Sequence, residues 1–143
     1  MKRCLADVNV WLPLLVRHHE HHTLATRWFD GLAPGEAVLC RFVQLALVRL
    51  LGNRTIMGKY ALSASAAWDL IAELMEDERL EFVAEPPMVD AVFPKLSRYA
   101  TPTNKLVGDA YLAAFSIAGQ MALTTVDKGF EQFRGVDLQL LSS

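Results

Sequence analysis

The sequence lacks an apolar stretch long enough to cross a membrane. Its longest nearly apolar run, Phe42–Leu51, is interrupted by Gln44 and Arg49, whereas a spanning helix needs about 20 consecutive apolar residues. The N-terminal segment reaches a carboxylate at Asp7, too early for the apolar core of a signal peptide. We therefore expect a cytoplasmic protein that makes no membrane contact.

Cysteine is also scarce, because the chain contains only Cys4 and Cys40. Two cysteines are too few for a disulfide framework or for a metal site built from cysteine alone. Both lie in or beside apolar segments, where a free thiol behaves as a small buried hydrophobic group. We therefore expect two buried thiols without a redox role.

Acidic residues are missing from two long segments, although the net charge is −2. Residues 37–68 contain no Asp or Glu but four basic residues, and residues 91–108 contain none but three basic residues. Half of the 16 acidic residues lie between Asp69 and Asp90. A protein that is neutral on average can still hold a basic groove for phosphates. The alternative is an ordinary solvated surface.

The order of strand-like and helix-like segments predicts the fold class. With 143 residues, 52% of them hydrophobic, the chain is expected to be a single domain, residues 1–143, with a packed core. Strands are expected at Arg3–Ala6, Ala37–Leu39, Leu80–Val83, Ala122–Val126 and Val136–Leu141. Helices are expected at Val8–Val16, His21–Phe29, Arg41–Leu51, Ser63–Glu76, Val89–Tyr99 and Val107–Gly119. This alternation predicts a three-layer α/β/α sandwich with a mostly parallel five-stranded sheet.

Three aspartates are expected to meet at one edge of that sheet. Asp7 and Asp127 directly follow the first and fourth strands, and Asp109 lies at the start of the helix that leads to the fourth strand. Ligands of such sheets bind outside the carboxyl ends of the strands. Clustered carboxylates repel one another unless a cation lies among them, and their hard oxygens suit Mg²⁺ or Mn²⁺. Alternatively, Asp7 and Asp109 are helix N-caps and Asp127 begins a turn.

The segments around these aspartates resemble the motifs of a known family. Leu5–Leu12 resembles the opening motif of PIN domains, and of VapC-type toxins in particular. Leu106–Ala114 resembles their third acidic motif, and Leu123–Phe130 resembles the fourth. The order and spacing of the motifs and the chain length also agree, so the resemblance covers nearly the whole sequence.

The resemblance implies a function and a set of partners. It implies an α/β/α fold and an endoribonuclease that depends on Mg²⁺ (or Mn²⁺) and cleaves single-stranded or structured RNA. It also implies that the chain is the toxin of a toxin–antitoxin pair, forms a homodimer and binds a VapB-like antitoxin that inserts a segment near the active site. Carried over by motif, Asp7, Asp109 and Asp127 are catalytic. Asp7 and Asp109 are direct metal ligands, and Asp127 is a further or water-mediated ligand.

The sequence departs from the family pattern at two positions. Many PIN domains carry Glu in the helix after the second strand, where this chain has Gln44, and some carry a second Asp where it has Gly129. A helix with Gln followed by Leu–Arg resembles one branch of the VapC-type toxins, in which Gln44 and Asn104 are expected to contact substrate. Asn104 could instead cap a turn. The smaller negative charge leads us to expect one tightly held metal ion.

Other functions fit the sequence less well. A phosphatase of the haloacid dehalogenase type needs a second Asp where this chain has Asn9. A receiver domain needs paired acids at the first strand and a late lysine, and that pattern does not fit. The serious alternative is a non-catalytic module that keeps the PIN fold and binds RNA or protein. The lack of an acid at Gln44 favours this alternative, and the three aspartates oppose it.

Overall fold

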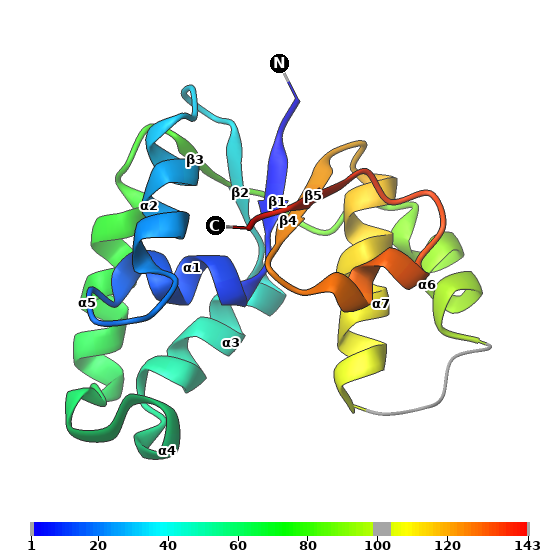
Figure 1. The fold of residues 1–143 in the computed structure, drawn as a ribbon. Coiled ribbons are helices and arrows are strands. Elements are labelled where there is room, and N and C mark those ends of the chain that lie inside the picture. Colours follow the sequence, from blue (N-terminus) through cyan, green and yellow to red (C-terminus); the bar gives the residue numbers. More distant parts are fainter. Residues whose placement is uncertain (1, 99–103, 143) are drawn as a thin grey trace.

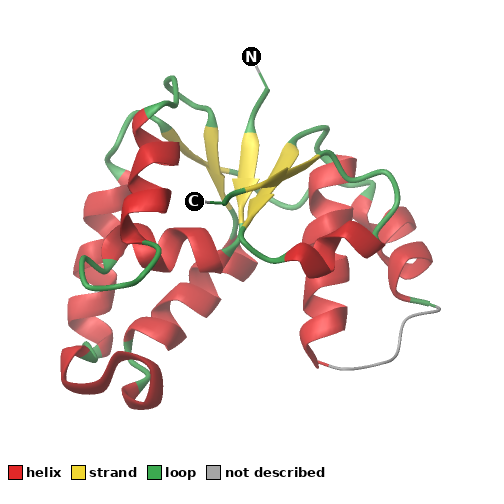
Figure 2. Cartoon of the chain, in the orientation of Figure 1, coloured by secondary structure: helices red, strands yellow, loops and turns green. Residues whose placement is uncertain are grey.

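The computed structural model, which describes residues 2–98 and 104–142, is built around one parallel β-sheet (Figures 1 and 2). All neighbouring strands are parallel, in the order β3–β2–β1–β4–β5. On the central strand β1, Cys4 pairs with Ala37 of β2 on one side and with Ala122 of β4 on the other. The strands are β1 Cys4–Ala6, β2 Ala37–Leu39, β3 Leu80–Phe82, β4 Ala122–Thr125 and β5 Leu138–Leu140.

Helices lie on both sides of the sheet, which confirms the predicted α/β/α sandwich. Figure 1 shows α1, α2, α3 and α5 gathered on one side and α6 and α7 on the other. The helices are α1 Val8–Leu15, α2 His22–Asp30, α3 Arg41–Leu51, α4 Arg54–Met57, α5 Ala64–Met75, α6 Val89–Ser97 and α7 Asn104–Ala118, with 3₁₀ turns η1 Gly58–Tyr60 and η2 Lys128–Gln132. No helix within the described ranges is long and apolar enough to span a bilayer.

The three central strands form the middle of the core. Every residue of β1, β2 and β4 is buried, whereas the edge strands β3 and β5 are only partly covered. On the side of α1, the fully buried Trp11 packs edge-on against Trp28 and Phe29, and its indole N–H donates to the Ala6 carbonyl (3.0 Å). Phe115 of α7 is buried on the other side. Burial on both faces fixes the carboxyl ends of β1 and β4, which carry the site.

The elements differ from the prediction at a few boundaries. Helix α7 begins at Asn104 and not at Val107, so that Asp109 lies in its second turn and is not its N-cap. The short helix α4 was not predicted, because four residues show no helical periodicity. The Asn53 side chain starts it by accepting the backbone N–H groups of Thr55 and Ile56. The other predicted elements are found with ends shifted by at most two residues. The predicted C-terminal end of α6, Tyr99, lies outside the described residues.

Candidate active site

Asp7 is fixed at the carboxyl end of β1 by backbone hydrogen bonds. Its own N–H donates to the Thr124 carbonyl of β4 (2.9 Å). Its Oδ1 accepts the N–H of Val8 (2.7 Å), so the side chain caps α1. The residue is only 8% exposed. A buried carboxylate therefore faces the edge of the sheet from a rigid position between two central strands.

The environment of Asp7 opposes its negative charge. Burial raises its pKa to about 6, and the charges of Asp109 and Asp127 act in the same direction. The hydrogen bond from Val8 and the charge of Lys105 act against this rise. The structure therefore brings the three predicted aspartates within interaction distance of one another, although they come from distant parts of the sequence.

Asp127 follows β4 and begins the 3₁₀ turn η2. Its Oδ1 accepts the backbone N–H of Gly129 (2.8 Å), and this bond closes the turn. The hydrogen bond from Lys105, and after it the bond from Gly129, lower the pKa of this carboxyl group. Asp109 reaches the same place from α7, and burial raises its pKa despite the nearby lysine. Asp7 therefore caps a helix and Asp127 begins a turn, as the alternative interpretation of the sequence proposed. Both residues also belong to the acid cluster.

Lys105 joins two of the three acids, a role that the sequence did not reveal. Its Nζ lies 2.9 Å from Asp109 Oδ2 and 2.6 Å from Asp127 Oδ2. The partner carboxylates are 15% and 30% exposed, and the lysine side chain is 70% exposed. The spacing of four residues between Lys105 and Asp109 on one helix was the available signal. A cation therefore occupies the gap between these two carboxylates.

Thr125 is a second residue of the site that the sequence did not reveal. It is fully buried at the end of β4, and its Oγ1 accepts the backbone N–H of Asp127 (3.1 Å). Oγ1 also lies 3.4 Å from Asp7 Oδ2 and 3.0 Å from Asn9 Nδ2. Asn9 Oδ1 in turn accepts the N–H of Val126 (3.4 Å). This one hydroxyl group therefore links the positions of Asp7 and Asp127.

The two predicted substrate residues are not joined to the acid cluster by a described contact. Gln44 is 3% exposed; its Oε1 accepts from the Arg41 guanidinium, and its Nε2 lies 3.5 Å from Met75 Sδ. Within the described residues, none of its hydrogen bonds reaches Asp7, Asp109 or Asp127. Asn104 begins α7, but its side chain lies outside the described part of the structure. Substrate contact by either residue stays a prediction.

The donor chemistry of the cluster suits a hard divalent cation. The described residues contain no group of three or more His, Cys, Asp or Glu side chains already arranged to hold a metal ion. The Lys105 ammonium nevertheless shows that oxygens of Asp109 and Asp127 converge on one cation position. Asp7 is a third carboxylate beside them, and burial raises its pKa although the charge of Lys105 acts against the rise. Carboxylate oxygens of this kind bind Mg²⁺ and Mn²⁺.

Replacing Asp7 with Asn is expected to stabilise the metal-free protein at neutral pH. A carboxyl group whose pKa is raised by folding favours the folded state below its ordinary pKa, and this contribution is lost as the pH rises through about 6. Above that pH, wild type must bury a charge that Asn lacks, a difference of about 3 kcal/mol. The side-chain oxygen of asparagine can also accept the Val8 N–H, so the helix keeps its N-cap.

Urea unfolding in EDTA at pH 7.5 and pH 4 measures this difference. Asp7→Asn should unfold at higher urea than wild type at pH 7.5, and the gap should shrink at pH 4. The matched control is Asp69→Asn at an exposed position of α5, which should match wild type at both pH values. A gap that stays the same at both pH values would show that the charge of Asp7 is not the cause.

Comparison with known proteins identifies the family of the chain. The family model described as PIN domain matches residues 4–136. Ribonuclease VapC41 of Mycobacterium tuberculosis is 38% identical to this chain over 143 residues, covering 96% of the chain and 98% of that protein. Ribonuclease VapC29 of the same organism is 31% identical over 132 residues, covering 92% and 90%.

Solved structures share the fold at low sequence identity. Mycobacterium tuberculosis VapC20, described as a toxin that cleaves the sarcin-ricin loop, superposes with a TM-score of 0.68 at 15% identity, covering 97% of this chain and 99% of that one. The DNA-bound VapBC of Salmonella typhimurium gives a TM-score of 0.67 at 14% identity, covering 97% and 98%. By its family match and its sequence relatives, the chain belongs to the PIN-domain family, among the VapC-type ribonucleases.

Proposed function

We propose that this protein is an endoribonuclease that depends on Mg²⁺ or Mn²⁺ and acts in the cytoplasm as the toxin of a toxin–antitoxin pair. The observation that carries the proposal is the approach of Asp7, Asp109 and Asp127 to one another, with a cation already held between the last two. Its substrate would be single-stranded or structured RNA. The ribonucleases of related sequence support the same reaction class.

The three aspartates would hold a single metal ion. Asp7 and Asp109 are proposed as direct ligands, and Asp127 as a further ligand or one that acts through a bound water. The bound ion would activate a water and offset the negative charge that develops at the phosphate. Thr125 would position Asp7 and Asp127 through its hydrogen bonds, because its hydroxyl group lies against both residues. With Gln44 and Gly129 in place of further acids, the cluster would hold no second tightly bound ion.

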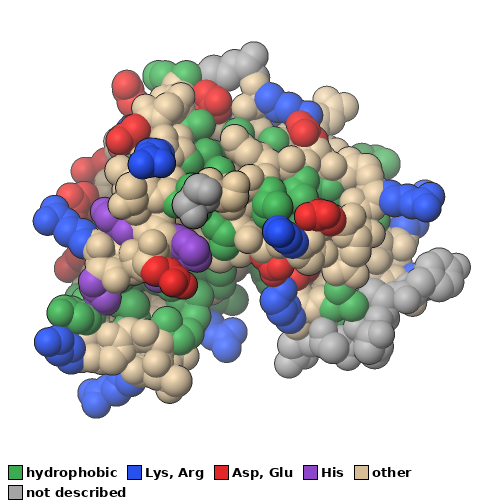
Figure 3. Space-filling view, in the orientation of Figure 1, with side chains coloured by type: hydrophobic (Ala, Val, Ile, Leu, Met, Phe, Trp, Pro, Cys, Tyr) green, Lys and Arg blue, Asp and Glu red, His purple; other side chains and the backbone are tan. Residues whose placement is uncertain are grey.

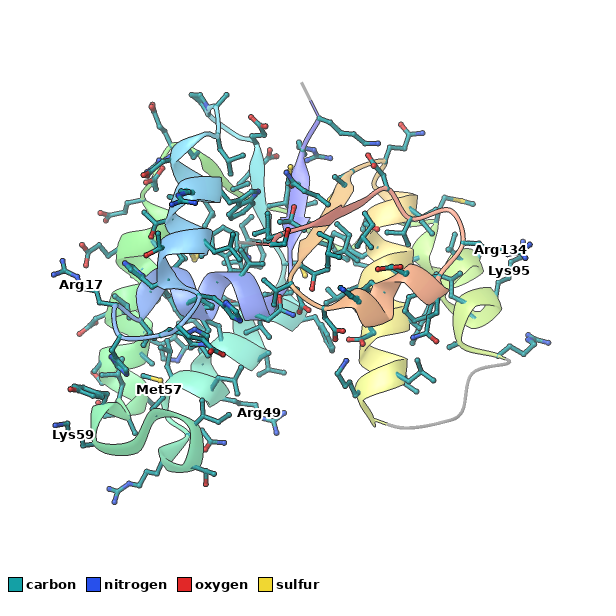
Figure 4. All side chains as sticks on the ribbon, in the orientation of Figure 1. Arg17, Arg49, Met57, Lys59, Lys95 and Arg134 are labelled. Carbon is teal, nitrogen blue, oxygen red and sulfur yellow. The ribbon has the colours of Figure 1, made fainter. Side chains whose placement is uncertain are left out.

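A basic notch beside the acids would receive the RNA. Figure 3 shows this notch between the part of the molecule that carries α3 and the part that carries α7, with Lys and Arg side chains on both sides. Arg49 lies on the α3 side (Figure 4), and Lys105 reaches the acid cluster from α7. Basic groups on both sides would hold the phosphates on either side of the cleaved bond, since phosphate contacts supply most of the affinity for nucleic acid.

A second candidate function is a non-catalytic PIN-fold module that binds RNA or protein. Two observations favour it: Lys105 already pairs with Asp109 and Asp127, and the side-chain oxygen of Gln44 accepts from Arg41. In this case the acids would form a structural ion-pair cluster. Calorimetric titration with Mg²⁺ separates the two functions, because only the enzyme requires the cluster to bind the ion.

Changing a metal ligand to its amide is expected to abolish RNA cleavage. Asp7→Asn and Asp109→Asn keep the side-chain size but remove a charged oxygen ligand, so activity should fall at least about 100-fold. Gln44→Ala should reduce activity less, because Gln44 offers no charge. The control Asp90→Asn changes an exposed residue of α6. The measurement is cleavage of labelled RNA in Mg²⁺, in Mn²⁺ and in EDTA. Cleavage in EDTA, or parental rates in both Asp variants, would refute this site.

We also propose a two-fold homodimer formed through α3 and α5. Four large apolar side chains on these helices are 38–56% exposed: Phe42, Leu45, Trp68 and Met75. The two helices adjoin, since Gln44 of α3 bonds to Met75 of α5. An apolar patch of this kind is typical of an interface between protein chains, and a two-fold dimer is the commonest assembly.

Light scattering tests this dimer. Wild type should be dimeric at micromolar concentration, and Leu45→Glu should shift it to monomer. The control Ile56→Glu changes an apolar residue of α4 that is equally exposed, at 53%, and should leave the dimer intact. A monomeric wild type at high micromolar concentration would contradict the proposal.

The partner that restrains the enzyme would be a VapB-like antitoxin with a basic segment. VapBC pairs are the subject of several structures that share this fold. In this chain an ammonium group already fits between Asp109 and Asp127, so an Arg or Lys of the antitoxin would suit the same carboxylates. An Asp7→Ala, Asp109→Ala variant should therefore bind the co-expressed antitoxin more weakly in calorimetry. Equal affinity would show that the acids take no part in the inhibition.

A further inference from the structure

Lys105 occupies the position that the proposed metal ion needs. Its Nζ lies within 3 Å of both Asp109 Oδ2 and Asp127 Oδ2. These oxygens cannot bind an ammonium group and a divalent ion in the same place. Any metal that enters between the two acids must therefore displace the lysine.

The side chain of Lys105 is suited to leave. It is 70% exposed, so that it can swing into solvent without uncovering the core. It belongs to the first turn of α7, one turn before Asp109, and reaches the acids from the rim of the site. Lysine carries its charge on a flexible four-carbon stem and makes no fixed two-pronged contact. Exposed pairs of this kind are individually weak, which makes them replaceable by a divalent ion.

The displaced ammonium group would remain beside the reaction site. The pocket next to it is lined by Lys105, Leu106, Asp109, Gly129 and Gln132, and no basic residue other than Lys105 is among them. Once a metal neutralises the acids, the nearest anion available to the lysine is a phosphate of bound RNA. Lys105 would thus pair with the acids when no metal is bound and with an RNA phosphate when the metal is bound.

We propose that Lys105 is the resident counter-cation of the acid cluster, which gives up its place to the metal ion and then binds a phosphate of the RNA. Lys105 is therefore a binding and positioning residue whose two partners alternate. This inference rests on the proposed metal-dependent function. It adds to that function a lysine that competes with the metal ion for Asp109 and Asp127.

Calorimetric titration with Mg²⁺ and Mn²⁺ of protein freed from metal by EDTA and dialysis tests the competition. Lys105→Met removes the competing charge and should tighten metal binding about tenfold, the size expected for two exposed charge pairs. Lys105→Arg keeps the charge and should stay near wild type. The matched control is Lys95→Met, which removes an exposed lysine on the side of α6 away from α3 (Figure 4). The melting temperature without metal, measured for each variant, should fall in Lys105→Met only.

The second arm measures the phosphate contact. Fluorescence anisotropy with a single-stranded phosphorothioate oligonucleotide, which resists hydrolysis, is recorded in Mg²⁺ over a range of salt concentrations. Lys105→Met should weaken binding, and the slope of log Kd against log salt should fall by about 0.7, as for the loss of one phosphate contact. Lys95→Met should keep the wild-type slope.

The outcomes separate this inference from the proposed function. If wild type and all variants fail to bind Mg²⁺ and Mn²⁺, the metal-dependent function is wrong and the inference falls with it. If metal binds with equal affinity to wild type and Lys105→Met, or if Lys105→Arg behaves as Lys105→Met does, the inference alone is wrong. An unchanged salt slope in Lys105→Met overturns the phosphate contact. Tighter metal binding together with a smaller slope, in Lys105→Met only, supports the whole proposal.

Discussion

The buried carboxylate of Asp7 is the charge around which the rest of the site is arranged. It stands at the end of the central strand, where the ladder to β4 and the first turn of α1 leave it 8% exposed. The fold supplies one backbone hydrogen bond to it and places two more carboxylates within interaction distance. Asp109 and Asp127 both raise the pKa of Asp7, and Asp127 raises that of Asp109, so the charged cluster needs a cation at this edge of the sheet.

This need for a cation connects features that otherwise look independent. In the structure it is met in part by Lys105, which pairs with Asp109 and Asp127 but not with Asp7. The pKa of Asp7 stays raised, chiefly because the residue is buried and also because Asp109 and Asp127 lie near it. A divalent ion would satisfy all three carboxylates, and a basic side chain from a partner would satisfy some of them. Under the proposed function, the metal ion, the antitoxin and Lys105 would therefore compete for the same carboxylates.

The sequence was sufficient to predict the sheet and the meeting of the three aspartates, because parallel strands bring their carboxyl ends to one edge. It did not reveal Lys105, whose contact with Asp127 depends on how α7 lies beside β4, nor Thr125, which is one of several small residues in a buried strand. Nor did it reveal the hydrogen bonds of Gln44 to Arg41 and Met75, and substrate contact by Gln44 stays a prediction. Such contacts depend on side-chain directions between elements, which periodicity does not encode.

The way the acids are held sets how much charge the site can present. Asp7 and Asp127 are held in a similar way: Oδ1 of each accepts a backbone N–H at the start of a helical turn. Oδ2 lies against the Thr125 hydroxyl at Asp7 and against Lys105 at Asp127. At Asp127 this arrangement depends on Gly129, where an added Cβ would lie 3.0 Å from Oδ1. A larger residue at that position would require this carboxylate to shift by a few tenths of an ångström. A third oriented carboxylate comes from Asp109, so three acids from distant parts of the chain place their negative charge at one edge of the sheet.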